Sequence, residues 1–120
     1  MRVFIDSDVI ISSLLSSKGA AFRLLHGTDI IPFISTASLK ELRVACKRLH
    51  IASDALETLI QKKFTVLDPN DSHVVAGAIS AKVAYLISYN LKHFRIENIK
   101  NDLKILCMTP ALFLQYLRSN

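Results

Sequence analysis

Three acidic side chains and one amide occupy positions from which they could bind a divalent metal ion. Asp6 follows a short apolar run, Glu41 lies one turn into an amphipathic stretch, and Asp71 opens a run of small apolar residues. Asn90 comes just after another short apolar run. Oxygen ligands of this kind suit Mg²⁺ or Mn²⁺. If the four side chains converge, they predict phosphodiester hydrolysis by metal-activated water.

The elements that would carry these residues follow from the apolar pattern. Short apolar runs predict buried strands, and helical spacing between them predicts helices. The predicted strands are residues 2–5, 30–34, 64–67, 84–87 and 103–108, and the predicted helices are residues 9–15, 20–25, 37–49, 53–63, 74–81 and 110–117. This alternation predicts one three-layer α/β/α domain over residues 1–120, with a central parallel sheet of about five strands.

In such a sheet, ligands bind beyond the carboxyl ends of the strands. Asp6 and Asn90 each follow a predicted strand, so both are expected at that edge. Glu41 lies about 100° around its helix from Leu42, on the flank of the apolar stripe. Asp71 reaches the edge only if its helix begins there. Pro32 cannot donate a ladder hydrogen bond, so it is expected at an edge or an irregular point of the sheet.

Each acid also has a simpler interpretation. Ser7 and Asp8 can both cap the first helix, which leaves Asp6 available for a second role. Asp71 could be only a helix cap, and Glu41 could be only a solvated carboxylate.

Composition narrows the class of protein. The chain has 120 residues, a net charge of +5 and a sequence pI near 9.4, which favours a polyanionic partner. No apolar run approaches the ~18 residues of a membrane span, and Asp6 interrupts the first apolar run too early for a signal peptide.

Cys46 and Cys107 fall in apolar patterns and are expected as buried thiols of a cytoplasmic protein. His73 and His93 have no Cys or His partner at zinc spacing.

Three segments carry a resemblance to a known family. VFIDSDVIISSLL (3–15), STASLKELRVACKRL (35–49) and DSHVVAGAISAKVAYLISYNLKHF (71–94) resemble, in this order, the PIN-domain nucleases, in particular the VapC-like toxins of prokaryotic toxin–antitoxin pairs. The resemblance implies Asp6, Glu41 and Asp71 as catalytic ligands of Mg²⁺ or Mn²⁺. It also implies RNA as the substrate, a homodimer, and a cognate antitoxin protein as partner.

One position departs from the family pattern. Many members carry a fourth acid where this chain has Asn90, which would be a weaker ligand or would orient water. Asp8 could partly compensate, although a capping role is favoured for it. The residues expected to contact nucleic acid are Ser88, at the usual hydroxyl position of the family, and the basic residues Lys92, Arg95 and Arg43.

Two other functions stay open. Because Asn90 weakens the metal site, the chain could be a PIN-like module that binds RNA or a protein without cutting. A phosphoryl-accepting signalling domain would use Asp68 after the third strand. That class also needs a lysine after the last strand, where this chain has Thr109 and Pro110.

Overall fold

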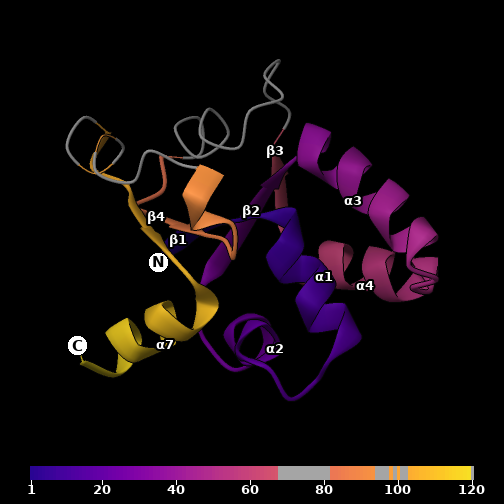
Figure 1. The fold of residues 1–120 in the computed structure, drawn as a ribbon, viewed down its shortest axis with the longest axis horizontal. Helices are drawn as coiled ribbons and strands as arrows, with labels where there is room; N and C mark the ends of the chain where they lie inside the picture. Colours follow the sequence, from indigo (N-terminus) through magenta and orange to yellow (C-terminus); the bar gives the residue numbers. More distant parts are fainter. Residues whose placement is uncertain (68–81, 94–97, 99, 101–102, 120) are drawn as a thin grey trace.

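Five parallel strands form one sheet at the centre of the molecule (Figure 1). The computed structural model describes residues 1–67, 82–93, 98, 100 and 103–119. The strands are β1 (Arg2–Ile5), β2 (Ile31–Ser35), β3 (Thr65–Leu67), β4 (Tyr85–Ile87) and β5 (Leu106–Met108). Their order across the sheet is β3-β2-β1-β4-β5, and every neighbouring pair is parallel. The predicted α/β class and the parallel sheet of about five strands are confirmed.

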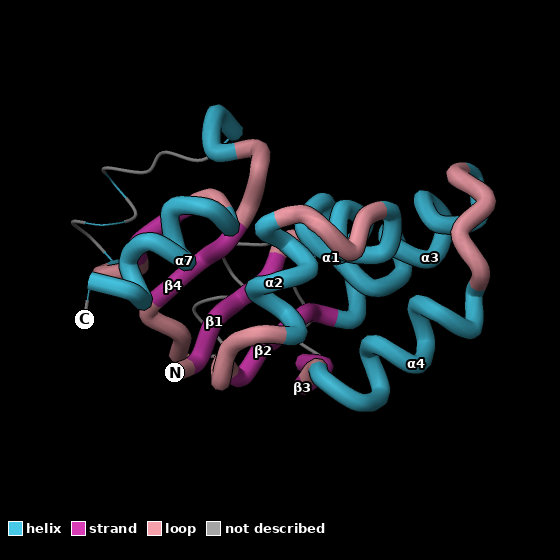
Figure 2. Tube along the Cα trace, turned by 90° about the horizontal axis from the view of Figure 1, so that it is seen from below, coloured by secondary structure: helices cyan, strands magenta, loops and turns pink. Residues whose placement is uncertain are grey.

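The helices of the described residues connect and cover these strands. They are α1 (Ser7–Leu15), α2 (Ala20–His26), α3 (Thr36–Arg48), α4 (Ser53–Lys63) and α7 (Pro110–Ser119), with a short 3₁₀ turn η1 (Leu91–His93) after β4. Figure 2 shows α7, α2 and α1 in succession along one face of the sheet, with the α3–α4 pair beyond them. These helices agree with the sequence prediction to within two residues at most ends.

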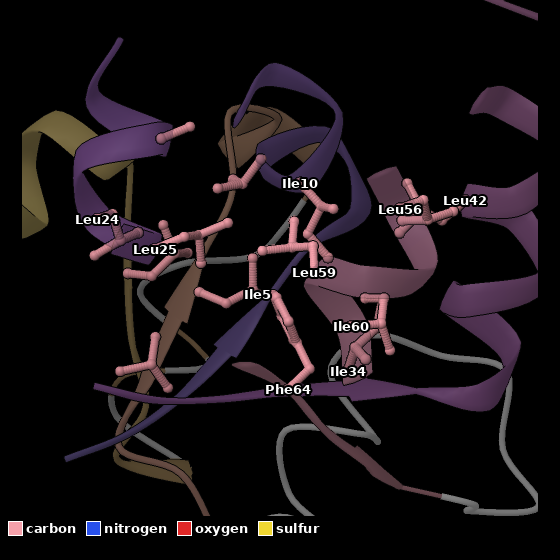
Figure 3. Close-up of a cluster of buried hydrophobic side chains, with 14 of the residues drawn as sticks. Ile5, Ile10, Leu24, Leu25, Ile34, Leu42, Leu56, Leu59, Ile60 and Phe64 are labelled. Carbon is pink, nitrogen blue, oxygen red and sulfur yellow. The ribbon is translucent and has the colours of Figure 1, made fainter. Parts of the chain in front are cut away.

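Both faces of the sheet are buried, as a three-layer α/β/α fold requires. Side chains alternate along β1, so that Val3 and Ile5 belong to one apolar cluster and Phe4 to another. The first cluster joins the sheet to the described helices, as Ile5, Ile10 and Leu25 illustrate in Figure 3. Phe4, on the other face, is also fully buried. Each such side chain contributes about 1.5–3 kcal/mol by leaving water.

Three strands are shorter than the apolar pattern predicts, and β4 is shorter by the single residue Ala84. Phe64 does not begin β3, because its N–H donates to the carbonyl of Ile60 and closes the last turn of α4. The predicted strand from residue 103 begins only at Leu106. Lys104 has a φ of 59° and donates its N–H to the carbonyl of Lys100, a turn geometry that extended pairing excludes. A count of apolar residues does not register these local hydrogen bonds.

Pro32 lies in an interior strand, which corrects the expectation that it marks an edge strand. Its neighbour Ile31 donates its N–H to the carbonyl of Met1, toward β1. Because successive N–H groups of a strand point to opposite sides, the position at Pro32 faces β3. Pairing between β2 and β3 begins only at Phe33. The missing N–H of Pro32 therefore interrupts no ladder, because Pro32 lies just before the β2–β3 pairing begins.

Helix α3 has defined caps at both ends. The hydroxyl of Ser35 accepts the N–H of Ser38, as predicted. At the other end, His50 has a φ of 58°, and the N–H of Ile51 donates to the carbonyl of Cys46. This is a Schellman ending with histidine at the position that glycine usually takes.

The predicted helix at 74–81, Asp71, Asp68, His73 and Arg95 lie outside the described residues. Within the described residues, no helix is long and apolar enough to cross a membrane.

Candidate metal site at the β1–β4 junction

The strand order contains a topological switch point between β1 and β4. From β1 the chain proceeds through β2 to β3 on one side, and then returns to place β4 on the other side of β1. In open α/β sheets, ligands bind beyond the carboxyl ends of the strands at such a point. Polar residues that follow β1 and β4 include Asp6, Asp8, Ser88 and Asn90. The topology therefore brings Asp6 and Asp8, at the start of α1, against the end of β4.

Asp6 is fixed by bonds to both of its neighbouring elements. Its backbone N–H donates to the carbonyl of Ile87 at 2.9 Å, which continues the pairing of β1 with β4. Its Oδ1 accepts the N–H of Ser7 at 2.8 Å, so Asp6 itself caps α1. The prediction that Ser7 or Asp8 would be the cap is wrong, because both residues already have helical positions. The second oxygen, Oδ2, faces Ser88.

Ser88 holds Asp6 from the side of β4. Its hydroxyl donates to Asp6 Oδ2 at 2.8 Å and accepts the backbone N–H of Asn90 at 3.0 Å. The bond from Asn90 occupies a lone pair and thereby directs the hydroxyl proton toward the carboxylate. Ser88 has no exposed surface. This corrects the expectation that it contacts nucleic acid, since its hydroxyl instead positions the first acid of the site.

Asp8 is the residue that sequence reasoning undervalued. From the first turn of α1, its Oδ2 accepts the backbone N–H of Tyr89 at 3.1 Å and lies 3.4 Å from the Ser88 hydroxyl. Its Oδ1 is buried and has no hydrogen-bond partner among the described residues. The signal in the sequence was the pair of acids around Ser7, because only one of the two can be the cap.

The surroundings of Asp8, which include the carboxylate of Asp6, make its ionisation less favourable. The pKa of Asp8 is raised above its ordinary value, first by burial and second by the negative charge of Asp6. The nearby N–H groups of Tyr89 and Val9 and the Ser88 hydroxyl lower the pKa of Asp8 and offset part of this effect. The first turn of α1 adds a partial positive charge that favours anions at both acids. The junction is thus a negatively charged, partly buried site that a cation would stabilise.

The other three predicted metal ligands are Glu41, Asn90 and Asp71. Glu41 is exposed on α3, and the described residues contain no group of three or more acidic, histidine or cysteine side chains arranged to hold a metal. The structure therefore does not bring Glu41 into a cluster with Asp6 and Asp8. Asn90 is exposed at the end of β4, and Asp71 lies outside the described residues. The metal-binding roles of these three residues stay predictions.

The basic residues expected to contact nucleic acid also differ from one another. Lys92 is exposed in η1, directly beyond the end of β4. Arg43 forms a two-bond ion pair with Glu57 of α4, with distances of 2.7 and 3.2 Å. That pair joins two helices at an exposed position and already occupies the guanidinium of Arg43. Lys92 is therefore better placed than Arg43 to receive a phosphate at the junction.

The donor atoms at the junction fit a hard divalent cation. Asp6 and Asp8 offer carboxylate oxygens, and the buried Oδ1 of Asp8 has no hydrogen bond among the described residues. Mg²⁺ and Mn²⁺ favour such oxygens and keep several waters when few protein ligands are present.

A groove elsewhere on the surface does not belong to this site. It has a volume of about 480 Å³ and lies between α1, α2 and α4, with Leu14, Phe22, His26 and Lys63 among its lining residues. Leu14 lies near the carboxyl end of α1, whereas Asp6 caps the opposite end. The pKa of His26 is lowered by burial and, to a smaller extent, by the charge of Lys63.

A comparison with known protein families identifies the fold. The family model described as PIN domain matches residues 2–92, about three quarters of the chain. The chain belongs to the PIN domain family. No curated protein and no solved structure matches it.

The matched segment of this PIN domain includes β1, β4, and the residues Asp6, Asp8 and Ser88. It therefore has a nuclease-type fold, and PIN domains are generally nucleases that use divalent metals such as Mg²⁺. The candidate metal site lies beyond the carboxyl ends of β1 and β4, where open α/β sheets in general bind ligands.

Proposed function

We propose that this PIN domain is an endoribonuclease that depends on Mg²⁺ or Mn²⁺ and hydrolyses RNA with water as the nucleophile. The observation that carries the proposal is the carboxylate pair at the β1–β4 junction. Asp6 and Asp8 approach a single hydroxyl, that of Ser88, and one buried oxygen of Asp8 lacks a donor among the described residues. An ion pair or a metal ion is the usual way to stabilise such a charge.

The chain's own residues have separable roles in this reaction. Asp6, together with Glu41 and Asp71, would hold the ion, and Asn90 would be a weak ligand or would orient water. When bound, a divalent ion supplies a lowered pKa for the attacking water and positive charge against the phosphate. Ser88 holds the Asp6 carboxylate in one orientation through the 2.8 Å hydrogen bond. Such fixed orientation avoids reorganisation when charge develops on the phosphate.

Binding of RNA is assigned to basic residues beyond β4. Lys92 is exposed next to the junction, and Arg95 follows it in the sequence. Contacts to phosphates position a nucleic acid but do not select its sequence. Arg43 would contribute less, because Glu57 competes for its guanidinium.

The biological role proposed is that of a cytoplasmic toxin, active as a homodimer and inhibited by a cognate antitoxin protein. The resemblance to VapC-like toxins motivates this part of the proposal. Exposed apolar residues on α3 and at its end, Val44 and Leu49, support the expectation that the helices between residues 37 and 63 contact a second copy or the antitoxin.

The test of the enzymatic proposal is cleavage of a mixed RNA pool by the purified protein with Mg²⁺ or Mn²⁺. Wild type is expected to cut, Asp6→Asn is expected to be inactive, and Asp29→Asn is the matched control. Asp29 is an exposed acid just before β2, at the end of the sheet where the parallel strands begin. The β1–β4 junction lies at the other end, where the strands finish. Equal cleavage by wild type and Asp6→Asn would refute the mechanism.

Chemical modification of the substrate separates this activity from a contaminating ribonuclease. Water attacks the phosphorus directly in the proposed reaction, so an RNA with 2′-O-methyl groups should still be cut. A nuclease that uses the 2′-hydroxyl as its nucleophile would leave that RNA intact. Cleavage that requires the 2′-hydroxyl would therefore count against the proposal.

A second candidate function is a PIN domain that binds RNA without cutting it. The neutral, exposed Asn90 favours it. This candidate predicts RNA binding that weakens steeply with salt, and no cleavage in any divalent metal. A phosphoryl-accepting domain is disfavoured, because Thr109 follows β5 where that class needs a lysine.

A further inference from the structure

We infer that Asp8 is itself a ligand of the divalent ion and supplies the carboxylate that Asn90 does not provide. The inference rests on the proposed function, because it assigns a residue to the same metal site. In this assignment, one negative charge of the metal site comes from the first turn of α1, and not from the end of β4.

Capping does not account for the position of Asp8. The cap of α1 is Asp6, whose Oδ1 accepts the N–H of Ser7. Asp8 instead reaches across to β4, where its Oδ2 accepts the N–H of Tyr89 at 3.1 Å. Asp6, which precedes α1, and Asp8, in its first turn, therefore both lie against the end of β4.

The hydrogen bonds at the junction satisfy Asp6 but not Asp8. Ser88 has a single hydroxyl proton, and the 2.8 Å distance to Asp6 is much shorter than the 3.4 Å distance to Asp8. The proton therefore belongs to the bond with Asp6. Asp8 retains one firm hydrogen bond, from Tyr89, and its buried Oδ1 has none among the described residues. A buried anionic oxygen without a donor is costly unless a cation binds it.

Asn90 does not supply this charge. Its side chain is a neutral amide on an exposed residue, and its backbone N–H is already used by Ser88. Asp8, from the first turn of α1, approaches the same hydroxyl. A cation bound between Asp6 and Asp8 would relieve the repulsion between them and coordinate the oxygen that lacks a partner.

Thermal unfolding with and without Mn²⁺ tests the inference without measuring activity. Asparagine can still accept the Tyr89 N–H, so Asp8→Asn is expected to fold. In EDTA its midpoint should be above that of wild type, because the repulsion is removed. The Mn²⁺ concentration that raises its midpoint should be on the order of a hundredfold or more higher than for wild type, because loss of an outer-shell partner alone already costs about 10–100-fold. Asp8→Ala serves the same comparison if the asparagine variant does not fold.

The controls separate the inference from the proposed function. Asp6→Asn should lose the response to Mn²⁺, and Asp29→Asn should respond like wild type. If Asp8→Asn responds like wild type while Asp6→Asn does not, Asp8 only holds Tyr89 and the inference is wrong, although the metal site stands. If wild type itself shows no response to Mn²⁺, the inference and the proposed function both fail.

Discussion

Replacing Ser88 with alanine would test how the junction is held together. The variant loses a hydrogen bond to the carboxylate of Asp6 and another from the N–H of Asn90. A hydrogen bond to a charged group contributes roughly 1.5–3 kcal/mol, and a neutral one about 1 kcal/mol. Asp6 is half-buried, so water would replace part of the loss. We therefore expect Ser88→Ala to lower the free energy of unfolding by about 2 kcal/mol.

The chain offers a matched control for this change. Ser13 is also buried, but its hydroxyl donates to the carbonyl of Ile10 within α1. That bond adds little to a helix, and alanine has the higher helix propensity, so Ser13→Ala should change stability by at most about 0.5 kcal/mol. In urea unfolding with an m-value of about 1.5 kcal/mol/M, the midpoint of Ser88→Ala should fall by roughly 1.3 M. Similar midpoints for the two variants would refute the reasoning.

Two further predictions concern other parts of the fold. His50 has a φ of 58° at the end of α3, a backbone conformation in which glycine has no steric penalty. In urea unfolding, His50→Gly should therefore raise the free energy of unfolding by about 1 kcal/mol. His50→Ala keeps the Cβ and should not raise it. Destabilisation by glycine would contradict the assigned cap. The pKa of His26 is lowered by burial and by Lys63, so its neutral form is favoured in the folded state. The neutral His26 side chain should therefore contribute to the free energy of unfolding above about pH 6.5. This contribution should be lost as the pH falls below that value. An NMR titration of Lys63→Gln should move the His26 pKa only part of the way back, because burial remains, and a full return to the ordinary value would contradict that order of causes.

The sheet was predictable because its strands are short, apolar and separated by helical patterns. Runs such as the one before Asp6 have no other place in a folded chain than the interior, and their alternation with helices requires parallel pairing. The predicted ends of strands were less accurate. At Phe64 and Lys104, a helix end and a left-handed residue decide where pairing begins, and both are properties of local backbone hydrogen bonds.

The site was only partly predictable for a related reason. Asp6 follows a strand, so its place at the sheet edge could be derived from the sequence. The roles of Ser88 and Asp8 depend on which side of β1 receives β4, because that pairing brings the two ends together. Residue spacing does not determine strand order. The apolar pattern does not predict that Ser88 is completely buried. Ser88 is a polar residue, and the two residues that follow it, Tyr89 and Asn90, are exposed.

Direct counting of bound Mn²⁺ by electron paramagnetic resonance tests the central claim, that the β1–β4 junction holds a divalent ion through Asp6. Wild type and Asp29→Asn should bind Mn²⁺ with equal affinity, and Asp6→Asn should lose that binding while it remains folded. Mn²⁺ binding by Asp6→Asn that equals binding by wild type would place the metal elsewhere and contradict the account.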